Sequence, residues 1–256
     1  MAKQKSPQKM QGTVGGLTYY KTKRGHLVRE SGGVDKARIS KDPAYKRTRE
    51  NMSEFAEAGA VGKLIRQAFR SLLVSMSDGQ VTSRLVSALF SIIKTDLIND
   101  RGARRVAAGD LSLLEGFEFN VNAVLANTLY SSYAATIDRA TGQLGIEFPP
   151  FVPEKLISAH ASATHFKIIS AAAAIDFVNT KFEVKEVSTG EIALGETPTE
   201  AISLQNTLPA NSEHPLLLLL GIEFYQETNG KMYLLKDKSF NAFSLIKVDV
   251  PAPFNP

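Results

Sequence analysis

The chain has 256 residues, of which 43% are hydrophobic and 22% are charged, and it contains no Cys. This composition is typical of a globular protein with one large or two small domains, and it excludes disulfides, thiolate metal sites and Cys nucleophiles. No apolar run approaches the roughly 20 residues of a membrane span. No secretory signal follows the basic N-terminus. We therefore expect a cytoplasmic protein without membrane insertion, and leaderless export to the cell surface or exterior stays open.

Positive charge is concentrated towards the N-terminus. Residues 1–75 contain 16 Lys and Arg against 6 Asp and Glu. Residues 76–150 contain 6 against 8, and residues 151–256 contain 8 against 12. The sequence thus joins a basic segment to an acidic body. Such a segment can bind nucleic acid, or it can bind the acidic body of another copy.

Residues 1–41 are predicted to form an extended basic arm that contains a β-hairpin. The segment Leu17–Glu30 is β-branched and aromatic at both ends, and Arg24-Gly25 supplies the turn. The glycines of Gly12–Gly16 indicate a flexible or bulged strand, because a phosphate-binding loop needs a buried strand before it and a helix after it. A lone hairpin is marginally stable in water. The arm must therefore pack on its own body, on a partner or on a polyanion.

Residues 42–108 are predicted to form a helical hairpin. Asp42 and Pro43 supply an N-cap and a first helical residue, and apolar residues at three-to-four spacing extend the helix to Asp78-Gly79. A second helix is predicted from Val81 to about Asn99. Small residues crowd positions 56–62. Because glycine disfavours a helix, we expect the second helix or another chain to approach this stretch closely.

Residues 109–256 are predicted to form an antiparallel, Ig-like β-sandwich, which makes the whole chain α+β. Several short β-rich runs without intervening helices are typical of such a domain. Thr228-Asn229-Gly230 is the strongest hairpin signal among them. The predicted strands are Gly116–Val121, Tyr130–Asp138, Leu144–Phe148, Thr164–Ser170, Lys181–Val187, Ala201–Gln205, Leu216–Gln226, Lys231–Leu235 and Phe240–Val250.

No pattern in the sequence indicates catalysis. The four histidines lack the spacing of a zinc site, no nucleophile elbow or Walker loop is present, and the acidic residues select no catalytic pair. We therefore expect no enzyme, no catalytic residue, no metal and no cofactor, and we identify no small-molecule substrate. A glycan-binding or small-ligand sandwich is a third interpretation, for which the sequence indicates no site.

Two functions remain. The favoured one is a structural subunit that assembles with itself into a filament, tube or other oligomer by donating its basic arm to a neighbour, as in strand exchange. The candidate interface residues are Tyr19, Tyr20, Leu27 and Val28 as apolar anchors, and Lys21, Lys23, Arg24 and Arg29 as partners of acidic strands. The alternative is nucleic-acid binding. Its candidate residues are Lys3, Lys5, Lys9, Lys21, Lys23, Arg24, Lys46, Arg47 and Arg49.

Six stretches of the chain are similar to one known family, namely Met1–Lys5, Gly12–Lys21, Leu27–Val34, Asp42–Asn51, Ala159–Asp176 and His214–Phe224. The family that they resemble consists of uncharacterised proteins from Bacteroidota. The resemblance spans most of the chain and implies a bacterial origin. The family has no assigned activity, so the resemblance implies no functional residues.

Overall fold

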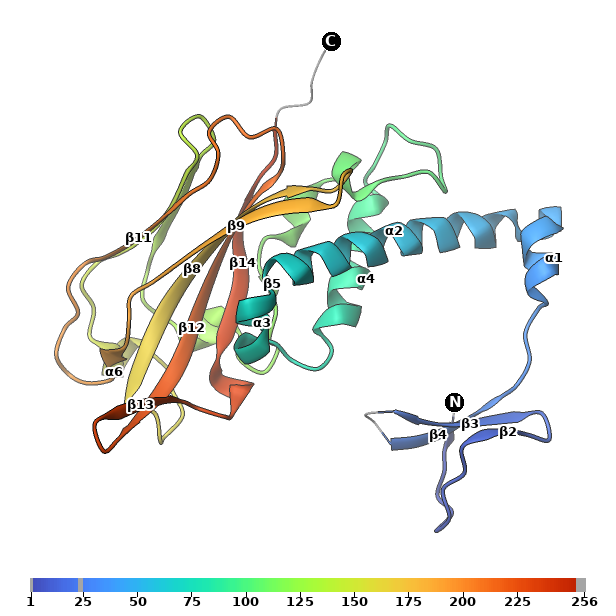
Figure 1. The fold of residues 1–256 in the computed structure, drawn as a ribbon, viewed down its shortest axis with the longest axis horizontal. Coiled ribbons are helices and arrows are strands. Elements are labelled where there is room, and N and C mark those ends of the chain that lie inside the picture. The colour runs from blue at the N-terminus through green and yellow to red at the C-terminus, as the bar shows by residue number, and fades with distance from the viewer. Residues whose placement is uncertain (1, 23–24, 252–256) are drawn as a thin grey trace. The chain divides into compact units, whose positions relative to one another are not determined.

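The computed structural model describes residues 2–22 and 25–251, and Figure 1 shows a mixed α+β fold with several antiparallel sheets. The chain divides into two compact units, residues 1–51, called the N-terminal unit below, and residues 52–256, called the body. The sequence-based division at residues 41 and 108 stays a prediction. None of the helices in the described part of the chain is long and apolar enough to cross a membrane.

The helices of the described residues are α1 (Lys36–Lys41), α2 (Lys46–Ala68), α3 (Arg70–Met76), α4 (Val81–Ile93), α5 (Leu125–Thr128) and α6 (Pro153–Leu156). Short 3-10 turns cover Pro43–Tyr45, Val106–Ala108, Leu111–Leu114 and Lys238–Phe240. The strands are β1 (Ala2–Lys3), β2 (Gly12–Val14), β3 (Leu17–Thr22), β4 (Gly25–Glu30), β5 (Phe117–Glu118), β6 (Ala134–Asp138), β7 (Gln143–Phe148), β8 (His165–Asp176), β9 (Lys181–Ser188), β10 (Ile192–Ala193), β11 (Ile202–Thr207), β12 (Leu216–Thr228), β13 (Lys231–Leu234) and β14 (Ala242–Asp249).

The helical segment starts as expected but is divided differently. The Asp42 carboxylate accepts a hydrogen bond from the backbone N–H of Ala44 at 2.9 Å, which confirms the predicted cap. The predicted first helix is interrupted at Phe69, whose buried ring packs edge-on against Phe243 at 6.1 Å between centroids. The second helix ends at Ile93 rather than near Asn99. Its end is followed by Asp96, whose carboxylate accepts backbone N–H groups that a longer helix would use.

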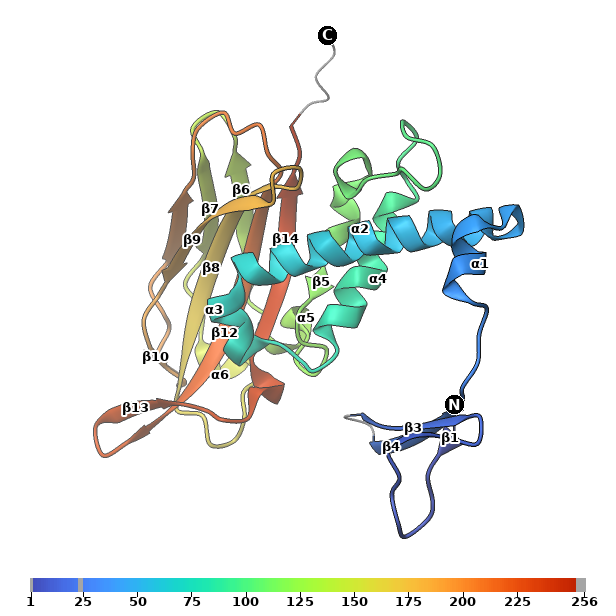
Figure 2. The same cartoon turned by 45° about the vertical axis from the view of Figure 1, so that its right-hand side comes forward.

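The close approach predicted for the small-residue stretch occurs within the chain at Gly62. A Cβ atom on Gly62 would lie 3.3 Å from a Leu89 methyl of α4, whereas a Cβ on Gly59 would meet nothing within 4 Å. In Figures 1 and 2, α4 crosses α2 steeply instead of lying along it. The two helices also meet at Phe55 and Phe90, whose rings pack edge-on with centroids 6.0 Å apart. They pack across each other, and the assignment of residues 42–108 to a helical hairpin stays a prediction.

A seven-stranded antiparallel sheet forms the centre of the body. Its main path runs β10-β8-β12-β14-β5, with β9 also paired to β8 and β13 to β12. A three-stranded antiparallel sheet has the order β11-β7-β6. The turn at Asn229-Gly230 joins β12 to β13 with positive φ at both residues, as its sequence predicts.

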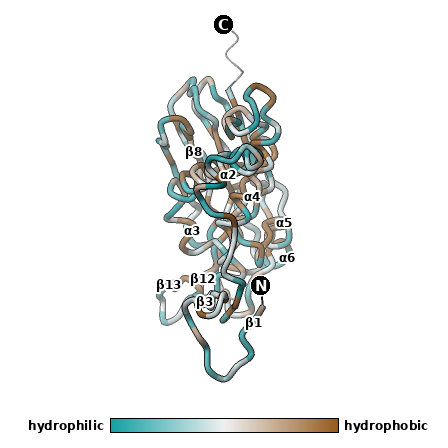
Figure 3. Tube along the Cα trace, turned by 90° about the vertical axis from the view of Figure 1, so that its right-hand side faces the viewer, coloured by the Kyte–Doolittle hydropathy of each residue, from teal (hydrophilic) through white to brown (hydrophobic). Residues whose placement is uncertain are grey.

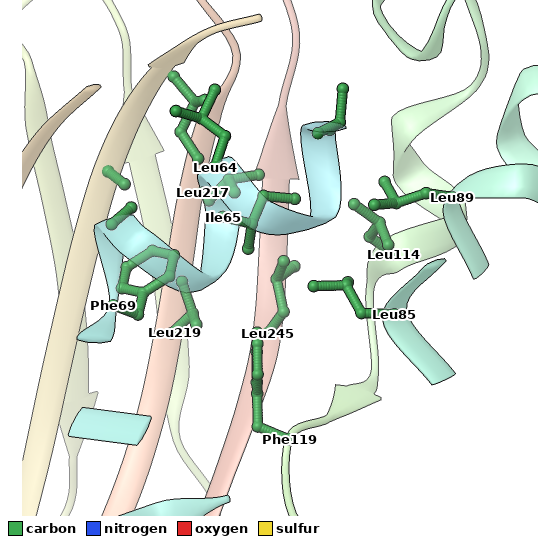
Figure 4. Close-up of a cluster of buried hydrophobic side chains, with 14 of the residues drawn as sticks. Leu64, Ile65, Phe69, Leu85, Leu89, Leu114, Phe119, Leu217, Leu219 and Leu245 are labelled. Atoms are coloured by element: carbon green, nitrogen blue, oxygen red, sulfur yellow. The ribbon is translucent and has the colours of Figure 1, made fainter. Parts of the chain in front are cut away.

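The central strands β8 and β12 are buried on both faces, and this accounts for their sequences. Along β12, Leu217 and Leu219 point into a core shared with α2, α3 and α4, part of which Figure 4 shows. Leu218 and Leu220 point into a second core, shared with β7 and β11. In a strand that is covered on both faces, every side chain is buried, so consecutive apolar residues all contribute hydrophobic stabilisation. The run Leu216–Leu220 is therefore apolar throughout and does not alternate with polar residues.

The antiparallel strands predicted for residues 109–256 are present, since each predicted run overlaps an observed strand. The Ig-like arrangement is not confirmed, because helices pack against one face of the larger sheet. The short helices α5 and α6 were not predicted between the strands, and two strand features were not predicted either. Strand β8 continues through Ala171–Ala174, and β10 adds a short pair at Ile192↔Phe166.

A buried polar network attaches α3 to β12. The carboxylate of Glu223, which is buried, accepts hydrogen bonds from the Ser75 hydroxyl and, at 3.0 Å, from the Tyr225 hydroxyl. The ammonium group of Lys167 lies 3.9 Å from the same carboxylate. The charge of Glu223 is thus compensated where it is buried, and the network fixes the end of the helical layer on the sheet.

Replacing Gly59 and Gly62 separately tests the crossing of α2 and α4. Gly59→Ala should raise the free energy of unfolding by about 0.5–1 kcal/mol, because alanine favours a helix and the added methyl meets open space. Gly62→Ala should gain less than Gly59→Ala or lose stability, because its methyl group presses on Leu89. Urea unfolding of both variants measures the difference, and equal gains would contradict the contact.

Candidate assembly site

The predicted hairpin is present, and its register divides the apolar anchors between two faces. Strands β3 and β4 pair Tyr19 with Val28 and Tyr20 with Leu27. Because neighbouring side chains on a strand point to opposite faces, Tyr19 and Val28 share one face and Tyr20 and Leu27 share the other. The four anchors therefore present two apolar pairs in opposite directions. A single flat surface can contact only one pair.

The basic residues of the hairpin follow the same division. Lys21 lies on the Tyr19 face, opposite His26. The Arg29 guanidinium lies over the Tyr20 ring on the other face, 5.7 Å from its centroid. Lys23 and Arg24, also predicted for this interface, lie outside the described residues.

Two short strands flank the hairpin, and the sequence analysis did not foresee them. Strand β1 pairs with β4 and β2 pairs with β3, which gives a four-stranded sheet of order β1-β4-β3-β2. The turn between β2 and β3 is Gly15-Gly16, with positive φ at both residues. A Gly-Gly pair between two β-rich runs is a signal for this turn. Both outer edges of the hairpin are thus partly paired within the chain.

The loop between β1 and β2 is held by one amide side chain. The Gln4 side-chain N–H₂ donates to the carbonyls of Leu27 at 3.0 Å and Met10 at 3.2 Å, and its oxygen accepts from the Met10 N–H at 3.0 Å. The Lys9 ammonium donates to the carbonyls of Gln4 and Ser6 at 2.8 and 2.6 Å. Lys9, predicted to bind nucleic acid, is thereby engaged in its own loop.

No described residue of the N-terminal unit is buried. On the Tyr19 face, Val14 is directly opposite Leu17, and their exposed fractions are 63% and 38%. Together with Tyr19 and Val28 they form an apolar face, called the Val14 face below. A sheet needs a covered hydrophobic face to be independently stable. This unit lacks such cover from its own residues.

The cations at the start of α2 are also engaged locally. The Arg47 guanidinium pairs with Glu50 at 2.9 Å, and the Lys46 ammonium lies 3.9 Å from the same carboxylate. Arg49 donates to the carbonyls of Ile39 and Asp42 at 2.7 and 2.9 Å, which ties α1 to α2. These contacts compensate positive charge at a helix N-terminus, which is otherwise unfavourable. The exposed Lys3 and Lys5 form no ion pair with any described residue.

Glu118 of the body is a carboxyl group with a strongly raised pKa. Glu118 of β5 lines a cavity of about 450 Å³ together with Tyr130, Tyr133 and Leu125. Burial raises the pKa of Glu118 from 4.5 to about 7, although the N–H of Leu125 donates to its carboxylate at 3.1 Å. Burial also raises the pKa of Tyr133, and the nearby Glu118 adds to this. Sequence patterns did not indicate this cavity, since its lining comes from distant segments.

A basic helix face is a further feature that the sequence analysis missed. Lys63, Arg66 and Arg70 recur at three-to-four spacing across α2 and α3 and line one cavity. The spacing was visible in the sequence, but a charged helix face is ordinarily a solvated one. Figure 3 shows hydrophilic and hydrophobic colours intermixed in the region of α2 and α4.

Within residues 2–22 and 25–251, no group of three or more His, Asp or Glu side chains is placed to hold a metal ion. Comparison with known protein families, with characterised proteins and with solved structures finds no match. Functional inference therefore depends on the geometry of the chain itself.

The shifted pKa of Glu118 predicts a pH dependence of stability. Between pH 4.5 and about 7 the folded protein holds a proton on Glu118 that the unfolded chain releases, so the contribution of this group to stability falls as pH rises through that window. The melting temperature of Glu118→Gln should fall less than that of the wild type between about pH 5 and pH 8. Glu147→Gln, at an exposed position on β7, is the matched control and should follow the wild type. Parallel profiles for Glu118→Gln and the wild type would contradict the raised pKa.

Proposed function

We propose that the protein is a structural subunit that assembles with itself, with the N-terminal unit of one copy docked on the body of the next. The observation that carries the proposal is the Val14 face, an apolar sheet face that its own unit leaves uncovered. Exposed apolar patches of this kind mark interaction sites. A neighbouring copy would supply the missing cover.

Charge favours another copy as the partner. The N-terminal unit contains 13 Lys and Arg against 4 Asp and Glu, whereas the body contains 17 against 22. Opposite net charges steer two copies towards contact between unlike parts. A contact between unlike surfaces is head-to-tail, and it gives a ring if the rotation closes or a filament or tube if it does not.

The register limits how the arm can be donated. Because β1 and β2 pair with only part of β4 and β3, donation by strand addition would use the remaining edge of the hairpin. Docking through the Val14 face uses Tyr19, Val28 and Lys21 instead, and leaves Tyr20, Leu27 and Arg29 on the opposite face. We propose face docking as the main contact. We also propose that the two sheets of the body adopt an Ig-like arrangement, and that the N-terminal unit of the neighbouring copy docks on these sheets.

Substitutions on the Val14 face test the assembly. In the full chain, Tyr19→Thr with Val28→Thr keeps β-forming residues while it removes the apolar contact. Light scattering of nuclease-treated protein should show large species for the wild type and a mean mass close to that of one chain for the double variant. Each hot-spot truncation weakens the contact by on the order of 2 kcal/mol or more.

Tyr20→Thr is the matched control, because it removes a Tyr from the opposite face of the same hairpin. It should assemble like the wild type. A wild-type chain that stays monomeric at moderate salt would refute the proposal. So would a double variant that assembles as the wild type does.

Nucleic-acid binding is the alternative function, and the contacts of the candidate cations weaken it. Lys9, Lys46, Arg47 and Arg49 have carboxylate or carbonyl partners inside the N-terminal unit, which leaves Lys3, Lys5 and Lys21 as the described candidates with no side-chain hydrogen bond or ion pair to a described residue. Few unpaired cations mean few counterions released on binding.

The salt dependence of binding to a single-stranded oligonucleotide separates the two functions. Three phosphate contacts predict a slope of log affinity on log salt of roughly −2, whereas engagement of all the candidate cations predicts roughly −6. We expect the shallow slope, measured by fluorescence anisotropy on freshly dissociated protein. A slope near the steep limit would favour nucleic-acid binding over self-assembly.

A further inference from the structure

The cavity lined by Lys63, Arg66 and Arg70 has the chemistry of an anion site. Its volume is about 460 Å³, and its walls come from α2, α3 and the start of α4 (Figure 2). The lining residues are Lys63, Arg66, Gln67, Arg70, Leu73, Val74, Ser77, Val81 and Thr82. Three of them are cations and none is an acid. This is unusual in a body whose acidic residues outnumber its basic ones.

The three cations form no ion pair with a described residue. Asp78, which is adjacent to the cavity lining in the sequence, is paired with the Arg84 guanidinium and accepts from the N–H groups of Gln80 and Val121. Glu186 approaches α3 through Ser71, whose hydroxyl donates to it at 2.7 Å, but it forms no ion pair with Arg70. The cavity thus gathers three positive charges without a direct carboxylate contact.

Arg66 supplies the most specific observation. Its Nε atom is buried and has no hydrogen-bond partner in the described part of the chain. A buried donor on a charged group is costly when it is left unpaired, and an arginine fork matches the oxygens of a phosphate group in pairs. The terminal nitrogens of the same guanidinium also form no hydrogen bond with a described residue, and Arg66 lines the cavity. These nitrogens can therefore bind an oxyanion there.

We propose that this cavity binds a small phosphorylated molecule, with its phosphate group on Arg66 and Arg70 and its apolar part on Leu73 and Val81. A phosphate group carries up to two negative charges, which suits a cluster of three cations better than one carboxylate does. Residues Gln67 and Thr82 add exposed polar groups at the rim. The site lies within the body and does not depend on the assembly proposed above.

Titration of the full chain with inorganic pyrophosphate by calorimetry, at constant ionic strength, tests the site. We expect one saturable site per chain. Arg66→Gln and Arg70→Gln should each weaken binding at least about ten-fold, because each removes charge-assisted hydrogen bonds. Arg66→Lys should also weaken it, since it keeps the charge but loses the fork. Arg70 is exposed, so Arg70→Gln keeps the test valid if an Arg66 variant does not fold.

Lys231→Gln is the control, because it removes one exposed positive charge from a strand remote in sequence from the cavity. It should bind as the wild type does. Absence of saturable binding would overturn the proposal, as would equal losses in Arg70→Gln and Lys231→Gln. Tighter binding of a single-stranded oligonucleotide than of pyrophosphate, lost in Arg70→Gln, would replace the small molecule by a polyanion and equally overturn it.

Discussion

The burial of β8 and β12 between two cores is the constraint on which the body depends. Leu217 and Leu219 require the helices on one side, and Leu218 and Leu220 require β7 and β11 on the other. Neither layer alone covers both faces of these strands. The helices and the smaller sheet thus belong to one cooperative structure, and the positions of the Arg66 cavity and of the Glu118 cavity follow from that packing.

Local signals made part of this fold readable from the sequence. The Asp42 cap, the Leu17–Glu30 hairpin and the Asn229-Gly230 turn each depend on a few adjacent residues. The helix break at Phe69 and the strand through Ala171–Ala174 were not readable, because distant residues decide them. Alanine favours a helix by itself, and only the two surrounding cores make this stretch a strand.

The candidate sites, too, could be predicted from the sequence only where adjacent residues determine them. The hairpin and its basic residues were predictable, but the sorting of Tyr19 and Tyr20 to opposite faces needed the register to be known. The internal partners of Arg49 are carbonyl groups, which no sequence pattern identifies. The spacing of Lys63, Arg66 and Arg70 was visible, but only the structure shows that the three side chains line one cavity.

The shortness of β1 and β2 bears on how selective self-association can be. These outer strands have two and three residues, so each side of the N-terminal sheet offers only a brief stretch of regular pairing. Long, flat, unpaired edges recruit any β-rich chain and lead to amyloid-like aggregation, and proteins avoid this by keeping edge strands short and placing Lys near them. The same sheet that leaves its Val14 face uncovered therefore discourages indiscriminate growth along its edges.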